Sequence, residues 1–144
     1  MEMTKERLEA YRSNREEIKE LDYILQNRWK DESLIRIATI NDYRKGYPVP
    51  QAVPGFDREE YERKQDRDIK RKEWLEQECR EGEEFIDEIE EGMARRIFRM
   101  YYIDGTERIT QRKVAKRIHV ERSTVSRKID DYLKDSHHSQ NAQL

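Results

Sequence analysis

The chain has 144 residues, of which 43% are charged and only 34% are hydrophobic, and its formal net charge is -2. A composition this poor in apolar residues favours long helices with narrow hydrophobic seams over a thick globular core. Five glycines and three prolines are also too few for a β-sandwich or a barrel, which turns about every ten residues.

The expected fold is all-α, a long coiled-coil-like helical hairpin followed by a C-terminal helix-turn-helix. Its first part is an N-terminal helical segment, residues 1–45. Thr4 can cap a helix that runs to about Trp29. The apolar residues of this helix fall on one face, as in a coiled-coil seam: Leu8, Tyr11, Ile18, Leu21, Leu25 and Trp29. A shorter helix is expected over residues 31–40, which are rich in Ile and Leu.

A proline-rich connector, residues 46–56, separates this segment from a long second helix over residues 57–92. Three prolines within seven positions cannot form a helix interior. Asp57 can cap the second helix, and the helical pattern continues to about Tyr102. Gly82 costs about 1 kcal/mol relative to Ala in a helix, so we expect a break or kink there. The seam residues recur at steps of mostly three and four: Tyr61, Ile69, Leu75, Cys79, Ile86, Ile89, Met93, Ile97 and Met100.

A helix with so little apolar surface is not stable alone and must pack against a partner. The partner is either the first helix of the same chain, returning antiparallel, or a second copy of the protein. Cys79, the single cysteine, excludes an internal disulfide and a cysteine-rich zinc site. Its place on the seam indicates a small core residue rather than a nucleophile.

Residues 93–135 are interpreted as a separate C-terminal domain, and residues 136–144 as a disordered tail. Thr110 can cap a short helix whose inner face is formed by Val114, Ala115 and Ile118. His119 and Val120 make the turn. The next helix begins near Glu121, and its buried residues are Val125, Ile129 and either Tyr132 or Leu133. This spacing predicts a helix-turn-helix.

The outer faces of these two helices are polar and cationic. Residues 105–144 hold 9 Lys/Arg against 5 Asp/Glu, whereas residues 1–104 hold 21 against 27. Polyanion binding depends on local charge, so this end is expected to contact DNA. Residues on the second helix suit base edges in the major groove: Arg122, Ser123, Thr124, Ser126 and Arg127. Phosphate contacts are expected from Thr110, Gln111, Arg112, Lys113, Lys116, Arg117 and Lys128.

The sequence contains no catalytic motif, phosphate-binding loop or metal-ligand spacing. We therefore expect no enzymatic activity, no cofactor and no metal. The chain opens with charged residues rather than a secretory signal, and it has no apolar run of the roughly 20 residues that a membrane span needs. A cytoplasmic protein without membrane contact is expected.

The C-terminal run resembles the helix-turn-helix of sigma-factor region four. The whole layout more closely resembles the ArpU/RinA-type phage transcriptional regulators, through the segment Arg96-Ile-Phe-Arg-Met-Tyr-Tyr-Ile-Asp-Gly105 and the motif from Val114-Ala115 to Val125-Ser126-Arg127. The resemblance covers nearly the full chain. It implies a phage or prophage regulator of transcription, associated with the nucleoid of a bacterial host. His119 stands where many such motifs have Gly, and Lys128 where many have an apolar residue.

Three functional hypotheses follow. The first is a sequence-specific transcriptional regulator that acts as a homodimer, since one small reading head rarely gives useful specificity, and that also contacts RNA polymerase. The second is a DNA-recognition protein of phage packaging, similar to a small terminase subunit and assembled as a ring. The third is a coiled-coil protein-interaction module that binds no nucleic acid and instead docks on RNA polymerase or another protein, in which the C-terminal helices only cap the coiled coil.

Overall fold

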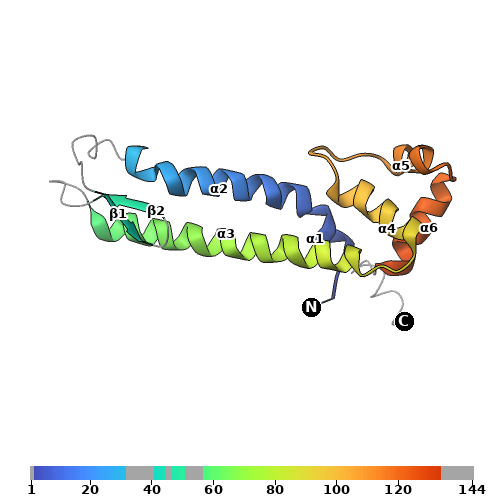
Figure 1. Ribbon diagram of the computed structural model, residues 1–144, viewed down its shortest axis with the longest axis horizontal. Coiled ribbons are helices and arrows are strands. Elements are labelled where there is room, and N and C mark those ends of the chain that lie inside the picture. The colour runs from blue at the N-terminus through green and yellow to red at the C-terminus, as the bar shows by residue number, and fades with distance from the viewer. Residues whose placement is uncertain (1, 32–40, 45–46, 51–56, 134–144) are drawn as a thin grey trace. The chain divides into compact units, whose positions relative to one another are not determined.

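The computed structural model describes residues 2–31, 41–44, 47–50 and 57–133, and it is mostly helical (Figure 1). The helices are α1 (Lys5–Glu9), α2 (Tyr11–Asp31), α3 (Arg58–Asp87), α4 (Gly92–Phe98), a π-helical turn η2 (Arg99–Ile103), α5 (Gln111–Ile118) and α6 (Arg122–Tyr132). The short helix predicted over residues 31–40 and the predicted tail over 136–144 lie outside the described residues, apart from Asp31, which ends α2.

Within the described ranges, the departure from an all-α fold is a pair of short antiparallel strands. Strand β1 (Asn41–Arg44) pairs with β2 (Tyr47–Pro50), so that Asn41 faces Pro50 and Arg44 faces Tyr47. Proline lacks the N–H that a sheet ladder uses and is therefore confined to edge strands. A two-stranded sheet consists only of edges, which is why a segment with two prolines can take part in one.

The chain divides into two compact units. One combines residues 1–15 with residues 77–144, and the other covers residues 16–76. This division differs from the predicted one, because the first fifteen residues pack with the C-terminal part of the chain rather than with residues 16–45. Helices α2 and α3 each contribute to both units.

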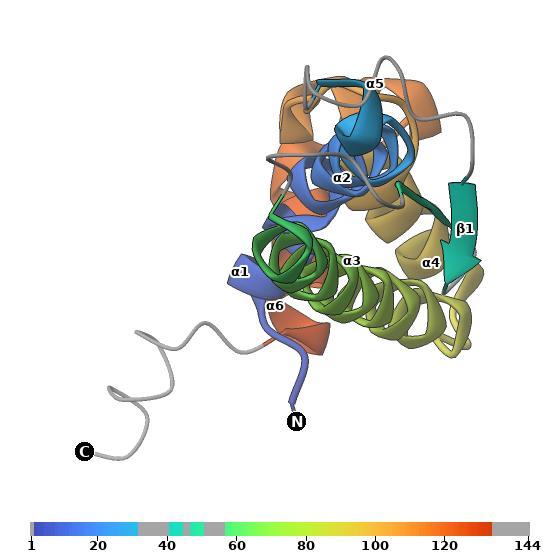
Figure 2. The ribbon, with the colours of Figure 1, turned by 90° about the vertical axis from the view of Figure 1, so that its left-hand side faces the viewer.

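In the unit of residues 16–76, α2 and α3 lie side by side and run antiparallel (Figures 1 and 2). Their buried apolar residues agree with the predicted seam and include Leu21, Leu25, Tyr61 and Leu75. Exposed ion pairs flank the seam, such as Arg71 with Glu17, at 2.8 Å between Nε and Oε2. The seam is narrow, as the composition requires.

The same seam contains a buried polar cluster that the hydrophobic pattern did not reveal. Arg28 is 8% exposed, Gln65 5% and Asp68 7%. The Arg28 guanidinium donates to Gln65 Oε1 at 2.5 Å and to the Asp68 carboxylate, while Gln65 Nε2 donates to the carbonyl of Leu25 at 3.3 Å. Burial acts to raise the pKa of Asp68, but hydrogen bonds from Arg67 and Arg28 outweigh it and lower this pKa overall.

Because a buried charge needs its partner, this cluster favours one register of α2 against α3. We expect Asp68→Leu to reduce the free energy of unfolding by about 3–5 kcal/mol, since it leaves Arg28 buried without its carboxylate. The double change Arg28→Met with Asp68→Leu should recover most of that loss. Urea unfolding measures both, and a single variant with the wild-type midpoint would contradict the prediction.

The lowered pKa of Asp68 also sets a pH window. A carboxyl group whose pKa is lower in the folded state stabilises the fold above its unfolded pKa, about 3.9 for Asp, and this contribution is lost as pH falls through the folded-state value. The stability difference between wild type and Asp68→Asn should therefore be constant near neutral pH and shrink below about pH 4. Urea unfolding across pH checks this.

The hydrophobic core of the other unit is centred on Phe98, which is fully buried at the end of α4. Its ring lies 6.1 Å from that of Phe85 on α3, 5.8 Å from Tyr102 in η2 and 5.9 Å from Tyr132 on α6. Leu8 of α1 belongs to the same cluster. One aromatic side chain therefore joins α4 to α3, η2 and α6.

Two predictions about the second helix are wrong. Helix α3 passes through Gly82 without a break and ends instead at Asp87, with residues 88–91 non-helical. Close packing explains why position 82 is a glycine, because a Cβ there would lie 3.3 Å from Leu8 Cδ2. Met93, predicted on the seam, is 39% exposed because it belongs to a separate helix, α4, whose buried residues are Ala94, Ile97 and Phe98.

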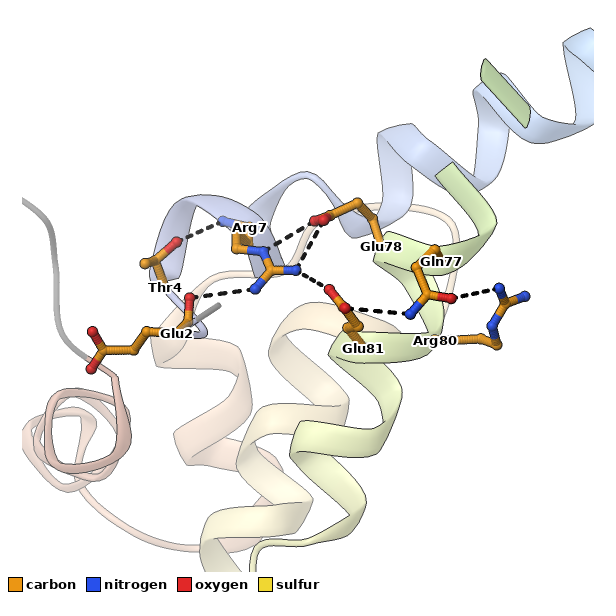
Figure 3. Close-up of polar contacts among 7 residues, drawn as sticks. All are labelled: Glu2, Thr4, Arg7, Gln77, Glu78, Arg80 and Glu81. Atoms are coloured by element: carbon orange, nitrogen blue, oxygen red, sulfur yellow. Dashed lines mark hydrogen bonds and ion pairs between the residues drawn. The ribbon is translucent and has the colours of Figure 1, made fainter. Parts of the chain in front are cut away.

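An ion-pair network fixes α1 on α3 next to this glycine (Figure 3). Arg7 lies between two glutamates, donating to both oxygens of Glu78 at 3.1 and 2.9 Å and also to Glu81. The predicted cap of α1 is confirmed, since Thr4 Oγ1 accepts from the backbone N–H of Arg7 at 3.2 Å. Asp57 likewise caps α3, accepting from the N–H of Glu60 at 3.0 Å.

We expect Gly82→Val to destabilise the protein by about 1–3 kcal/mol through overpacking against Leu8, although valine itself favours a helix more than glycine does. The matched control is the same change in a Leu8→Ala background, where the added methyl groups have room and the cost should fall. A double-mutant cycle by urea unfolding measures this coupling. Equal costs in both backgrounds would show that the Leu8 contact is not the reason for the glycine.

Candidate nucleic-acid interface

Helix α5 forms where the capping and periodicity signals placed it. Thr110 is its N-cap, with Oγ1 accepting from the N–H of Lys113 at 3.2 Å. The predicted inner face is confirmed, since Val114, Ala115 and Ile118 are all buried. The small side chain of Ala115, 4% exposed, belongs to the cluster that also contains residues of α6.

A left-handed residue makes the turn between α5 and α6. His119 has φ 61° and ψ 46°, the conformation for which many related turns use glycine, and the N–H of Val120 donates to the carbonyl of Ala115 at 3.0 Å. Val120 is partly buried against the core cluster. The turn therefore adopts the left-handed conformation with histidine instead of glycine.

Helix α6 begins at Arg122, and one of its faces is buried against the core. Val125 and Ile129 are fully buried. The sequence left open whether Tyr132 or Leu133 completes this face. Leu133 is buried at 3% exposed, while Tyr132 remains 38% exposed and contacts Phe98 with its ring. The exposed side of the helix is therefore set by the core beneath it.

The predicted interface residues are all outside the core. Lys128 is partly buried. The other cations of the two helices are exposed: Arg112, Lys113, Lys116, Arg117, Arg122 and Arg127. Thr110 and Ser123 are also exposed, whereas Gln111, Thr124 and Ser126 are half-buried. From residue 110 to residue 120 the chain carries four cations and no carboxylate.

Carboxylates lie at the edges of this surface. Lys128 pairs with Glu91 at 2.5 Å and is only 23% exposed, which makes it less available than the exposed cations of the two helices. Ser123 Oγ donates to Glu121 at 3.4 Å, and Asp130 pairs with Lys5 at 2.5 Å. Arg127 forms no such pair in the part of the chain that is described here, and its guanidinium is exposed.

The structure adds residues that the periodicity of the two helices did not indicate. An open hollow of about 800 Å³ borders the N-terminal ends of α5 and α6, and it is lined by Tyr101 and Arg108 in addition to predicted residues such as Arg112 and Arg122. Tyr101 comes from η2, and Arg108 from the coil that follows it. For Tyr101 the sequence signal was the segment 96–105, singled out only for its resemblance to phage regulators, whereas Arg108 lies outside that segment and had no such signal.

Arg12 of α2 forms hydrogen bonds to the end of η2 and the coil that follows it. Its guanidinium donates to the carbonyls of Tyr101 at 2.8 Å, Met100 at 3.2 Å and Asp104 at 2.8 Å. These are carbonyls at the end of η2 that would otherwise lack a helical partner. Burial lowers the pKa of Arg12, although the neighbouring Asp104 acts in the opposite direction.

Comparisons with family models, with curated proteins and with solved structures find no match to this chain. Across residues 2–31, 41–44, 47–50 and 57–133, no helix is both long enough and apolar enough to cross a bilayer. In the same part of the chain, His, Cys, Asp and Glu side chains form no group of three that could hold a metal ion. Cys79 is buried in the core.

The left-handed His119 generates a paired prediction. His119→Gly should raise the free energy of unfolding by about 0.5–1 kcal/mol, because glycine adopts this conformation without steric cost but gains freedom in the unfolded chain. His119→Val should lower it by more than 1 kcal/mol, since a β-branched residue is strained there. Thermal unfolding followed by circular dichroism checks both, and the same direction of change for the two variants would contradict the prediction.

Proposed function

We propose that this chain binds double-stranded DNA sequence-specifically and regulates transcription. In this proposal α2 and α3 form a coiled-coil-like hairpin, and α5, the turn at His119 and α6 form a helix-turn-helix. The observation that carries the proposal is the two-sided character of α6. Val125 and Ile129 are fully buried, whereas Ser123 and Arg127 on the opposite side are exposed. A helix held rigidly along one side and polar along the other suits the major groove.

The N-terminal half of α6 supplies the groups that read bases. A guanidinium such as that of Arg127 can donate two hydrogen bonds to the N7 and O6 atoms of a guanine, and hydroxyl groups can donate or accept at several base edges. The candidates for this role are the predicted set: Arg122, Ser123, Thr124, Ser126 and Arg127. Asp130 and Asp131 fall in the later half of the helix, where it leaves the groove.

Helix α5 supplies most of the contacts that position the protein without reading sequence. Its exposed cations have no carboxylate between them, which favours a phosphate backbone. We assign phosphate contacts to Thr110, Gln111, Arg112, Lys113, Lys116, Arg117 and Lys128. For Lys128 this requires release of its ion pair with Glu91, in which Lys128 is only 23% exposed.

A homodimer completes the proposal. One reading helix covers only a few base pairs, and two copies on half-sites about one helical turn apart would give useful specificity. The resemblance to ArpU/RinA-type regulators supports a phage or prophage protein acting in the cytoplasm of a bacterial host, with RNA polymerase as a further partner.

The test is selection of bound sites from random duplex DNA, followed by titration of the selected duplex against salt. We expect the logarithm of affinity to fall linearly with the logarithm of salt concentration, with a slope of about -0.9 for each phosphate neutralised. Arg127→Ala should relax the preference at one base pair by about 1–3 kcal/mol, whereas Lys116→Ala should weaken all sequences alike. Arg80→Ala, which removes an exposed guanidinium from α3, is the matched control and should leave binding unchanged.

No binding to any duplex at low salt would exclude this function and leave a protein-interaction module. An equal loss on every sequence for Arg127→Ala would exclude its reading role alone. The mass of the protein in solution separates the remaining assembly hypotheses, because a regulator of this kind is expected as a dimer and a packaging protein as a ring.

A further inference from the structure

The hollow beside α6 has the chemistry of a phosphate site. It measures about 800 Å³, is open to solvent, and is lined by three arginines and three hydroxyl groups: Arg108, Arg112, Arg122, Tyr101, Thr110 and Ser126. Among the described residues that line it, none carries a carboxylate. Guanidinium groups are the preferred partners of phosphate because their planar fork matches its oxygens.

The hollow divides the predicted reading residues of α6 into two groups. Arg122 and Ser126 lie four residues apart, hence on one side of the helix, and both line the hollow. Ser123 and Arg127 lie about 100° further around the helix and do not line it. The predicted reading face therefore has a flank that turns toward the start of α5 and a crest that faces outward.

Arg108 is available to bind an anion on that flank. Its side chain is 68% exposed, and the neighbouring Tyr101 raises its pKa. Its nearest carboxylate is Glu9, at 3.8 Å, which does not line the hollow. An exposed pair at that distance contributes little and can be released. Arg12 holds the carbonyls of Tyr101 and Asp104, which fixes the coil leading to Arg108.

We propose that the hollow binds phosphate groups of the DNA backbone along one flank of α6. Arg108 and Tyr101 are then contacts outside the helix-turn-helix, and Arg122 and Ser126 bind the backbone instead of base edges. A major groove is about 12 Å wide and is bordered by the two sugar-phosphate strands, so the flanks of a helix in the groove face phosphates while its crest faces bases. This inference rests on the proposed function.

The experiment uses the full chain and distinguishes a loss of affinity for every duplex from a loss of base preference. Arg108→Gln and Arg122→Ala should each weaken the selected duplex and unrelated duplexes by the same factor, and each should reduce the salt slope by about 0.9. Arg127→Ala should instead change the preference at one base pair. Arg99→Gln is the matched control, since Arg99 lies in the same π-turn as Tyr101 but pairs with Asp87, and it should change neither quantity. Wild-type thermal midpoints in all variants exclude misfolding.

A second arm separates the DNA backbone from a free phosphate ligand. Inorganic pyrophosphate, titrated by calorimetry, should bind too weakly to saturate in the millimolar range. Saturable pyrophosphate binding that Arg108→Gln abolishes, with duplex binding unchanged, would overturn the backbone assignment in favour of a small ligand.

Loss of preference at one base pair in Arg122→Ala would overturn the assignment of Arg122 to the backbone. If Arg108→Gln kept wild-type duplex binding and salt slope while Lys116→Ala still weakened binding, the phosphate-binding role of the hollow would be overturned. The proposed function would remain. Failure of the wild type itself on every duplex would instead remove the proposed function.

Discussion

Burial of the Phe98 ring is the interaction on which the arrangement of the candidate interface depends. The ring contacts Phe85, Tyr102 and Tyr132, which come from α3, η2 and α6. A chain in which 34% of the residues are hydrophobic has little apolar surface with which to build a core. Concentrating aromatic residues at one point allows α5 and α6 to be held by a few buried side chains each. Their remaining surface is then free to carry the cations and hydroxyl groups that a polyanion requires.

Local signals explain what the sequence predicts correctly. Thr4, Asp57 and Thr110 cap their helices as expected, because a capping hydrogen bond spans only three residues and is visible in the sequence itself. Periodicity also places the buried side of α5 and α6, since 3.6 residues per turn links sequence spacing to one face. These two kinds of signal are enough to place the helices and the polar faces of the candidate interface.

The errors arise where distant parts of the chain meet. Gly82 reads as a helix break until Leu8 is seen to occupy the space of its missing side chain. The buried Arg28 and Asp68 look like surface residues because neither is apolar, and they become core residues only as a pair. Tyr101 and Arg108 escape notice for a similar reason, because Arg12, far away in sequence, holds the carbonyls at the end of η2.

The place of Leu8 in the Phe98 cluster has a consequence for biosynthesis. The same cluster contains Ile129 and Leu133, and the neighbouring ion pair joins Lys5 to Asp130 across 125 residues of sequence. A ribosome that adds about 5–20 residues per second takes roughly 6–25 s to cover that interval. During this time α1 exists without the α6 residues of its cluster. The core of this unit can therefore be completed only after translation has passed α6, even though the α1–α3 contact at Gly82 can form earlier.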